Sequence, residues 1–132
     1  TKSMLAVWKD WNLDEILRNA YEKGIVMSGV SAGAICWFDK GITDSYAEKL
    51  AIIDCLGIVE GIACPHFDEE KEREPYVNDI INRDMINSCI CIEGNCALHI
   101  KNNIEYSSID FGNGKKCFKV SKEKNKLKKE IF

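Results

Sequence analysis

The five residues Gly29-Val30-Ser31-Ala32-Gly33 constrain the fold of this chain most, because they fit the G-x-S-x-G pattern of a nucleophile elbow. In such an elbow the chain turns sharply from a strand into a helix and lifts the serine hydroxyl above the sheet edge. The apolar run Ile25-Val26-Met27 before the pattern predicts a buried strand, and residues 32–38 after it predict a helix. Because so short a pattern also arises by chance, the rest of the chain has to support it.

The composition limits the class of protein. The 132 residues are enough for one domain and too few for two ordinary ones. No apolar run approaches the about 18 residues that a membrane-spanning helix needs, and a net charge of −3 gives no general attraction to nucleic acid. The lysine-rich end from Lys115 to Lys129 is typical of a solvated edge strand. We therefore expect neither nucleic acid nor a membrane as a partner.

The seven cysteines are odd in number and scattered, with no secretory leader before them, which favours the cytoplasm. A zinc site at Cys89, Cys91, Cys96 and His99 is a weak alternative, because the spacing lacks the paired cysteines of a zinc knuckle. We expect no metal and no cofactor. The chain begins without methionine on an apolar segment typical of a fold interior, so we expect it to be a fragment of a longer protein.

Other patterns predict the remaining elements. Asn12 caps an expected helix, residues 39–51 read as a loop, and residues 61–64 and 88–92 read as strands. A further helix is expected around Pro75. Four short alternating runs then predict a β-meander, at residues 97–100, 104–109, 116–120 and 127–131. Of the turns between them, Asn113-Gly114 is the strongest hairpin pattern.

A serine nucleophile needs a histidine base, and the chain has two histidines. His66 lies in Pro65-His66-Phe67-Asp68, directly after a predicted strand, where open α/β sheets carry their chemistry. His99 alternates within a short strand, so an exposed strand position explains it. We therefore expect His66 to be the functional histidine.

The base in turn needs a carboxylate on its other ring nitrogen, and two residues are candidates. Asp44 lies in the loop between serine and histidine, and Glu93 ends a predicted strand. A turn or cap explains either residue equally well, so both alternatives stay open. Cys64 is a rival nucleophile, although a small core residue explains it better.

Three segments together resemble the peptidase E family of serine peptidases, which includes aspartyl dipeptidases and, more distantly, cyanophycinases. They are residues 29–38 (GVSAGAICWF), residues 65–68 (PHFD) and residues 92–95 (IEGN). The resemblance implies a flavodoxin-like three-layer α/β sandwich related to class I glutamine amidotransferases, here without its N-terminal strands. Residues 1–132 would be one partial peptidase domain, with an α/β part over residues 1–94 and the β-meander over residues 95–132.

The resemblance also implies roles for single residues. Ser31 would be the nucleophile and His66 the base, with Glu93 matching one family position and Asp44 lying near another. The Ala32 N–H would be one oxyanion donor, and the family's second donor comes from a glycine-rich loop upstream of Thr1. Arg73 resembles the arginine of the aspartyl dipeptidases, although pairing with its flanking glutamates explains it too.

The sequence thus predicts a serine-type dipeptidase or exopeptidase that hydrolyses small peptides, with Asp-containing peptides favoured, through an acyl-enzyme. Two alternatives stay open: an impaired remnant that acts as a binding module, and an amidotransferase-like enzyme that uses Cys64. The sequence does not set the oligomeric state, and a homo-oligomer is one alternative.

Overall fold

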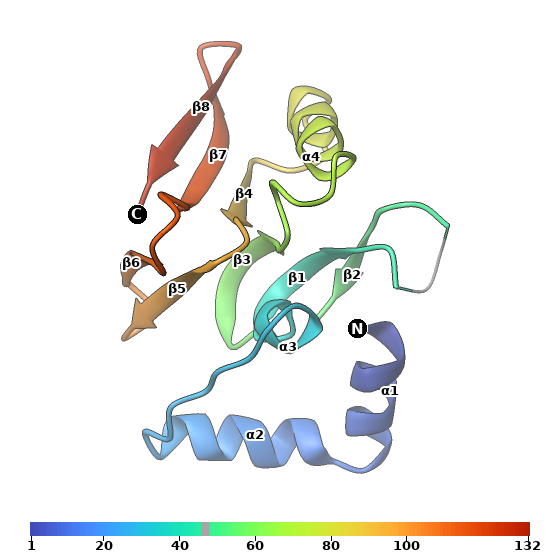
Figure 1. The fold of residues 1–132 in the computed structure, drawn as a ribbon. Coiled ribbons are helices and arrows are strands. Elements are labelled where there is room, and N and C mark those ends of the chain that lie inside the picture. Colours follow the sequence, from blue (N-terminus) through green and yellow to red (C-terminus); the bar gives the residue numbers. More distant parts are fainter. Residues whose placement is uncertain (46–47) are drawn as a thin grey trace. The chain divides into compact units, whose positions relative to one another are not determined.

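The computed structural model describes residues 1–45 and 48–132, and the chain divides into two compact units, residues 1–60 and 61–132. The first unit contains α1 (Lys2–Asp10), α2 (Leu13–Glu22), α3 (Ala32–Ile35), β1 (Phe38–Thr43) and β2 (Ala51–Asp54). The strand β3 (Val59–Cys64) leads into the second unit, which contains α4 (Arg73–Asn82), β4 (Ser88–Ile92), β5 (Cys96–Lys101), β6 (Glu105–Asp110), β7 (Cys117–Glu123) and β8 (Lys126–Ile131) (Figure 1). No helix in the described ranges is both long and apolar enough to cross a membrane.

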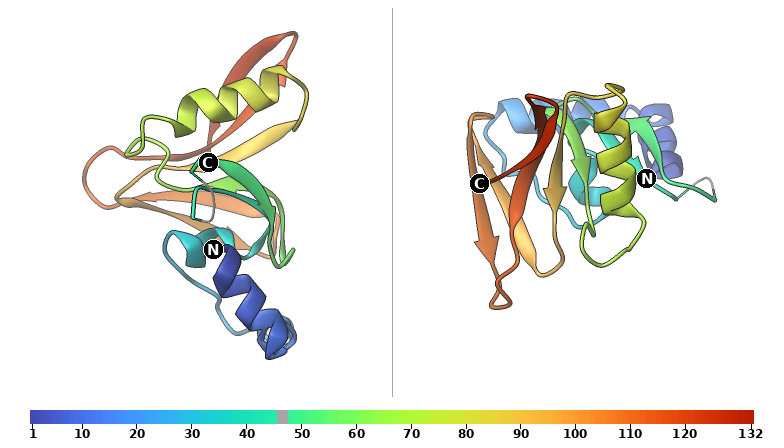
Figure 2. Two further views of the ribbon diagram at one scale, coloured as in Figure 1. Left: turned by 90° about the vertical axis from the view of Figure 1, so that its right-hand side faces the viewer. Right: turned by 90° about the horizontal axis from the view of Figure 1, so that it is seen from above.

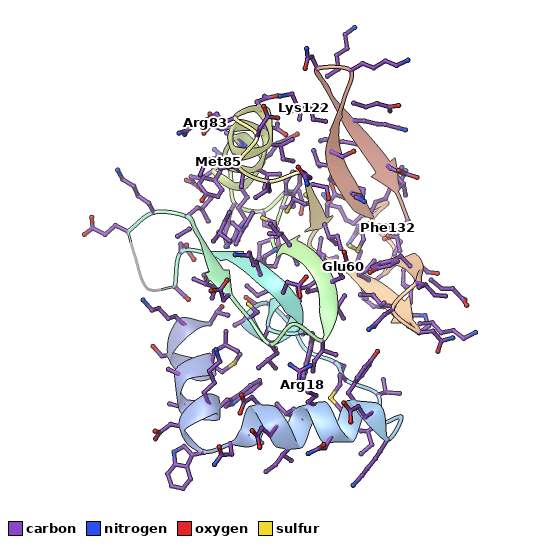
Figure 3. All side chains as sticks on the ribbon, turned by 180° about the vertical axis from the view of Figure 1, so that it is seen from behind. Arg18, Glu60, Arg83, Met85, Lys122 and Phe132 are labelled. Atoms are coloured by element: carbon purple, nitrogen blue, oxygen red, sulfur yellow. The ribbon has the colours of Figure 1, made fainter. Side chains whose placement is uncertain are left out.

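The core of the first unit joins its helices to the β1–β2 hairpin. Buried Leu5 from α1 clusters with Cys36, Ile53, Leu56 and Ile58. Partly buried aromatic rings cover this cluster, among them Trp8 and Trp37, whose centroids are 6.4 Å apart. Arg18 of α2, labelled in Figure 3, donates a hydrogen bond to the Leu56 carbonyl. The predicted helix after Asn12 is confirmed as α2, but the Asn12 side chain makes no capping hydrogen bond.

The predicted buried strand at residues 25–27 is wrong. These residues form no helix or strand, and Ile25 and Val26 are 56% and 87% exposed. A strand is stabilised by hydrogen bonds to a neighbouring strand, and no strand in residues 1–45 and 48–132 pairs with this segment. The apolar run therefore leads into the elbow as an irregular, largely exposed segment.

The segment after the elbow also differs from the prediction. The expected helix over residues 32–38 stops at Ile35, and Phe38 already begins β1. The expected loop over residues 39–51 contains most of β1 and the start of β2, which pair antiparallel, while residues 46 and 47 lie outside the described residues. Gly41 allows this, because a Cβ there would lie 2.7 Å from the Ile35 side chain. Close packing of α3 against β1 thus overrides the local polarity.

The second unit is built on a mixed sheet with strand order β3-β4-β7-β8. Strands β3 and β4 are parallel, whereas β4–β7 and β7–β8 are antiparallel. The helix α4 packs against this sheet (Figure 2). Its Val77, Ile80 and Ile81 side chains are buried. The predicted α/β class, the strand over residues 88–92 and the helix around Pro75 are confirmed, and the flavodoxin-like topology stays a prediction.

Lys122 of β7 fastens the end of α4 to the sheet. Its ammonium donates to the Asn82 carbonyl at 3.1 Å and to the Asp84 carboxylate at 2.8 Å. Figure 3 labels Lys122 together with Arg83 and Met85, which follow the C-terminal end of the helix. A cation at this position satisfies a helix carbonyl that has no partner within the helix.

The predicted β-meander is two separate hairpins. The strands β5 and β6 form their own two-stranded sheet, whereas β7 pairs with β4 and β8. Their turns, Asn102-Asn103 and Lys124-Asn125, have positive φ at both residues, as a tight hairpin turn requires. The hairpin predicted at Asn113-Gly114 is wrong, because these residues lie in the loop between β6 and β7, where backbone N–H groups bind the Asp110 carboxylate.

We predict that the stability of this loop depends on the ionisation of Asp110. The N–H groups of Asn113, Gly114, Gly112 and Lys115 donate to Asp110 at 2.9–3.3 Å, and they lower the pKa of its carboxyl. A lowered folded pKa stabilises the loop above the ordinary aspartate value of about 3.9, and this stability is lost as the pH falls through the folded pKa. We expect Asp110→Asn to speed amide hydrogen exchange at residues 112–115 at neutral pH, measured by NMR.

The matched control is Asp10→Asn, which removes the same charge from the exposed end of α1. Equal exchange at residues 112–115 in the two variants would show that the carboxylate does not hold the loop.

Candidate active site

Ser31 lies in a strained turn between an irregular segment and α3. Its φ is 54° and its ψ is −116°, and the Gly33 N–H donates to the Val30 carbonyl at 2.9 Å. These values describe the first central position of a type II′ turn, which glycine normally occupies. A serine held there stores about 1–3 kcal/mol of backbone strain. The half-buried serine therefore has the sharp backbone that the G-x-S-x-G pattern predicts.

The two glycines of the pattern have different roles. A Cβ on Gly29 would collide with the backbone carbonyl group and Cα of Gly33. A Cβ on Gly33 would meet no atom of the described residues within 4 Å. Gly29 is therefore the residue that lets the incoming chain pass close to the start of α3.

Ala32 and Asp44 lie in the same unit as Ser31. Ala32 is the first residue of α3, so its N–H is one that no helix carbonyl takes up, whereas the Ala34 and Ile35 N–H groups donate to the Ser31 carbonyl. Asp44 directly follows β1 and is exposed. The predicted roles of Ala32 as oxyanion donor and Asp44 as acid stay predictions.

His66 lies in the second unit, in a tight turn that follows the end of β3. Its φ is 52°, in the left-handed region, and its carbonyl accepts the N–H groups of Glu69 and Glu70 at 3.1 and 3.2 Å. The ring Nδ1 lies 2.6 Å from Oε2 of Glu69. The structure thus gives His66 a carboxylate partner that the sequence analysis missed.

The ends of β3 and β4 are tied together beside His66. The Phe67 N–H donates to the Ile92 carbonyl at 3.1 Å, and the Gly94 N–H donates to Asp68 at 2.7 Å. Asp68 also binds the Lys115 ammonium at 2.5 Å. Burial raises the pKa of Asp68, but the hydrogen bonds from Lys115 and Gly94 outweigh it and leave the pKa below its ordinary value.

Glu93 fastens the end of β4 to the start of β7. Its carboxylate accepts the Lys116 N–H at 2.8 Å, and its own N–H donates to the Lys116 carbonyl at 3.3 Å. These bonds give Glu93 a structural task at the strand end. Its predicted role as the acid of a triad stays a prediction.

Arg73 begins α4 and is only 3% exposed. Its Nε and Nη2 both lie 2.7 Å from one carboxylate oxygen of Glu70, and Nη1 points toward the Cys64 sulfur at 4.0 Å. Of the flanking glutamates, Glu74 binds Lys129. The guanidinium is therefore already paired inside the unit, and its predicted contact with a substrate carboxylate stays a prediction.

Cys64 is fully buried, which weakens its case as a nucleophile. Burial and the neighbouring Cys91 raise the pKa of the Cys64 thiol to about 12, against the opposing effect of Arg73. Because the thiolate is the reactive form, such a thiol reacts poorly near neutral pH. All seven cysteines are free thiols, and within residues 1–45 and 48–132 no cluster of three or more His, Cys, Asp or Glu side chains is suited to hold a metal ion.

Comparison with known proteins supplies the family. The sequence model described as Peptidase family S51 matches residues 1–105, a stretch that includes Ser31, His66 and Glu93. The chain belongs to peptidase family S51. The resemblance to the peptidase E family that the three segments carry is thereby confirmed.

A relative of this S51 chain is the uncharacterized peptidase YgaJ of Bacillus subtilis (strain 168), which is 40% identical over 120 residues. The alignment covers 91% of the chain and 52% of the relative. The chain therefore spans about half the length of the curated relative that it matches.

The unequal roles of the two elbow glycines can be tested in this S51 chain. We expect Gly29→Ala to lower the free energy of unfolding by about 1–3 kcal/mol, because its Cβ meets backbone atoms that cannot move aside. Gly33→Ala should change it little or raise it by up to about 1 kcal/mol, because alanine favours the helix. Urea unfolding of both variants gives the comparison, and an equal loss in both would contradict the steric role of Gly29.

Proposed function

We propose that this S51 chain carries the catalytic residues of a serine peptidase. The observation that carries the proposal is the strained type II′ backbone of Ser31 within a G-x-S-x-G sequence. Strain at a polar residue persists where the surrounding structure holds it, and such residues gather at active sites. Family membership supports peptide hydrolysis as the reaction.

In the proposed mechanism, the Ser31 hydroxyl oxygen attacks the scissile carbonyl carbon while His66 takes the hydroxyl proton. The Ala32 N–H stabilises the oxyanion, and such a donor contributes about 3–4 kcal/mol in other serine peptidases. His66 then gives its proton to the leaving amine, and an acyl-enzyme remains. A water molecule, deprotonated by His66, attacks the ester and releases the acid and the serine.

The position of His66 supports its role as base. It follows the end of a parallel strand and carries a carboxylate on Nδ1, so Nε2 is the nitrogen suited to accept the serine proton. His99, by contrast, lies exposed on β5 opposite Ser107 of β6. That pair gives matched controls for the two proposed catalytic residues.

The substrate side of the proposal is a small peptide, cleaved by a dipeptidase or exopeptidase. The preference for aspartyl peptides rests mainly on the family resemblance. Arg73 supports it less, because Glu70 already binds the Arg73 guanidinium. The free thiols support a reducing compartment such as the cytoplasm.

A fluorophosphonate probe tests the proposal, since it labels an activated serine. We expect Ser31→Ala to abolish labelling and His66→Ala to slow it by about 10³-fold or more, because each removes an essential partner in proton transfer. The measurement is the labelling rate at Ser31, followed by mass spectrometry of the labelled peptide.

Ser107→Ala and His99→Ala are the controls and should label like the unchanged chain. A chain that the probe does not label would contradict the proposal and favour the binding-module alternative. Peptide hydrolysis that survives Ser31→Ala but is lost in Cys64→Ala would favour the thiol enzyme instead.

A further inference from the structure

The carboxylate on His66 differs from both sequence candidates. Oε2 of Glu69 lies 2.6 Å from Nδ1 of His66, whereas the Glu93 carboxylate holds the Lys116 N–H. We propose that Glu69 is the positioning residue of His66, which keeps Nδ1 protonated and leaves Nε2 as the basic nitrogen. The catalytic consequence rests on the proposed serine peptidase function, but the hydrogen bond and its effect on the imidazole do not.

The backbone builds this pair locally. The left-handed φ of His66 turns the chain back on itself, so that its carbonyl accepts the N–H groups of Glu69 and Glu70. Two side chains three residues apart then lie on the same side of the turn. The contact therefore follows from the turn after β3 and needs no long-range loop to form.

Gly94 supplies a second and independent observation. A Cβ on Gly94 would collide with the Glu69 side chain, including its carboxylate carbon and one of its oxygens. The Gly94 N–H binds Asp68, next to Glu69 in the chain, so the end of β4 is held against the turn. The absence of a side chain at residue 94 thus leaves the space that the Glu69 carboxylate occupies.

The chemistry follows from the geometry. A carboxylate accepts a hydrogen bond from a protonated nitrogen, so Glu69 favours the imidazole tautomer with hydrogen on Nδ1. When Nε2 takes the serine proton, the same carboxylate stabilises the imidazolium. The Glu69 and His66 side chains are 46% and 32% exposed, so water screens this effect more than in a buried triad.

The size of the effect can be bounded. Replacing the buried aspartate of a serine protease triad by its amide costs about 10⁴ in turnover. Because the Glu69 carboxylate is half exposed, we expect a smaller loss, about 10- to 100-fold in the labelling rate of Ser31.

The test uses Glu69→Ala, with Glu72→Gln as the matched control that removes the same charge from an exposed position in the same charged segment. The ¹⁵N shifts of the His66 ring, measured by NMR at a pH where the imidazole is neutral, report the tautomer. We expect hydrogen on Nδ1 in the unchanged chain and in Glu72→Gln, and a shift toward hydrogen on Nε2 in Glu69→Ala. The fluorophosphonate labelling rate should fall about 10- to 100-fold in Glu69→Ala alone.

Gly94→Ala is the second variant, because it keeps the Glu69 carboxylate and displaces it. It should shift the tautomer in the same direction. The proposal is overturned if Glu69→Ala and Gly94→Ala both keep the tautomer of the Glu72→Gln control. If the unchanged chain is not labelled at all, the serine peptidase proposal fails, and the tautomer measurement alone decides the role of Glu69.

Discussion

The parallel pairing of β3 with β4 is the constraint on which the second unit depends. The register sets Cys64 beside Cys91, so both strands end at the same edge of the sheet. The turn that carries His66 and the turn at Glu93 and Gly94 therefore start from neighbouring points. Strand β4 pairs with β3 on one edge and with β7 on the other, and its three central residues are buried, which fits its run of small and branched apolar residues. A change in the β3–β4 register would separate the histidine turn from the glycine that makes room for Glu69.

Steric limits rather than attractive contacts shape both turns that carry candidate catalytic residues. At Ser31, a side chain on Gly29 would push the incoming segment away from α3, and at His66, a side chain on Gly94 would displace Glu69. Ser31 and His66 themselves adopt positive φ, at 54° and 52°. A residue other than glycine in this region costs free energy, which the packing around each turn has to offset. The two glycines allow close approach, and the two strained residues direct their side chains.

The sequence predicts those features of the fold that depend on neighbouring residues, and it fails for those that depend on a distant partner. The end of β3 before Pro65 and the strand at residues 88–92 were predictable, because an apolar run followed by polar residues needs no knowledge of the partner. The run at residues 25–27 has the same composition, but it is exposed because burial requires a paired strand, which composition does not encode. The hairpin prediction at Asn113-Gly114 is wrong for a similar reason, since the N–H groups of Gly112 and Lys115, which would close that turn, donate to the Asp110 carboxylate instead. The elbow pattern, in contrast, predicted the sharp turn at Ser31, because its glycine requirement is steric and local.

The choice of carboxylate for His66 shows the same limit at the level of single contacts. Glu69 was visible only as part of a charged segment, because its contact depends on the positive φ of His66. That contact also places the histidine in a markedly acidic neighbourhood. The hydrogen bond with Asp68 raises the pKa of Lys115, and the charges of Glu93 and Glu69 add to it, so one ammonium faces three carboxylates. This surplus of negative charge disfavours a further anion beside the turn. In the proposed peptidase, an aspartyl substrate would therefore need its carboxylate bound away from this turn.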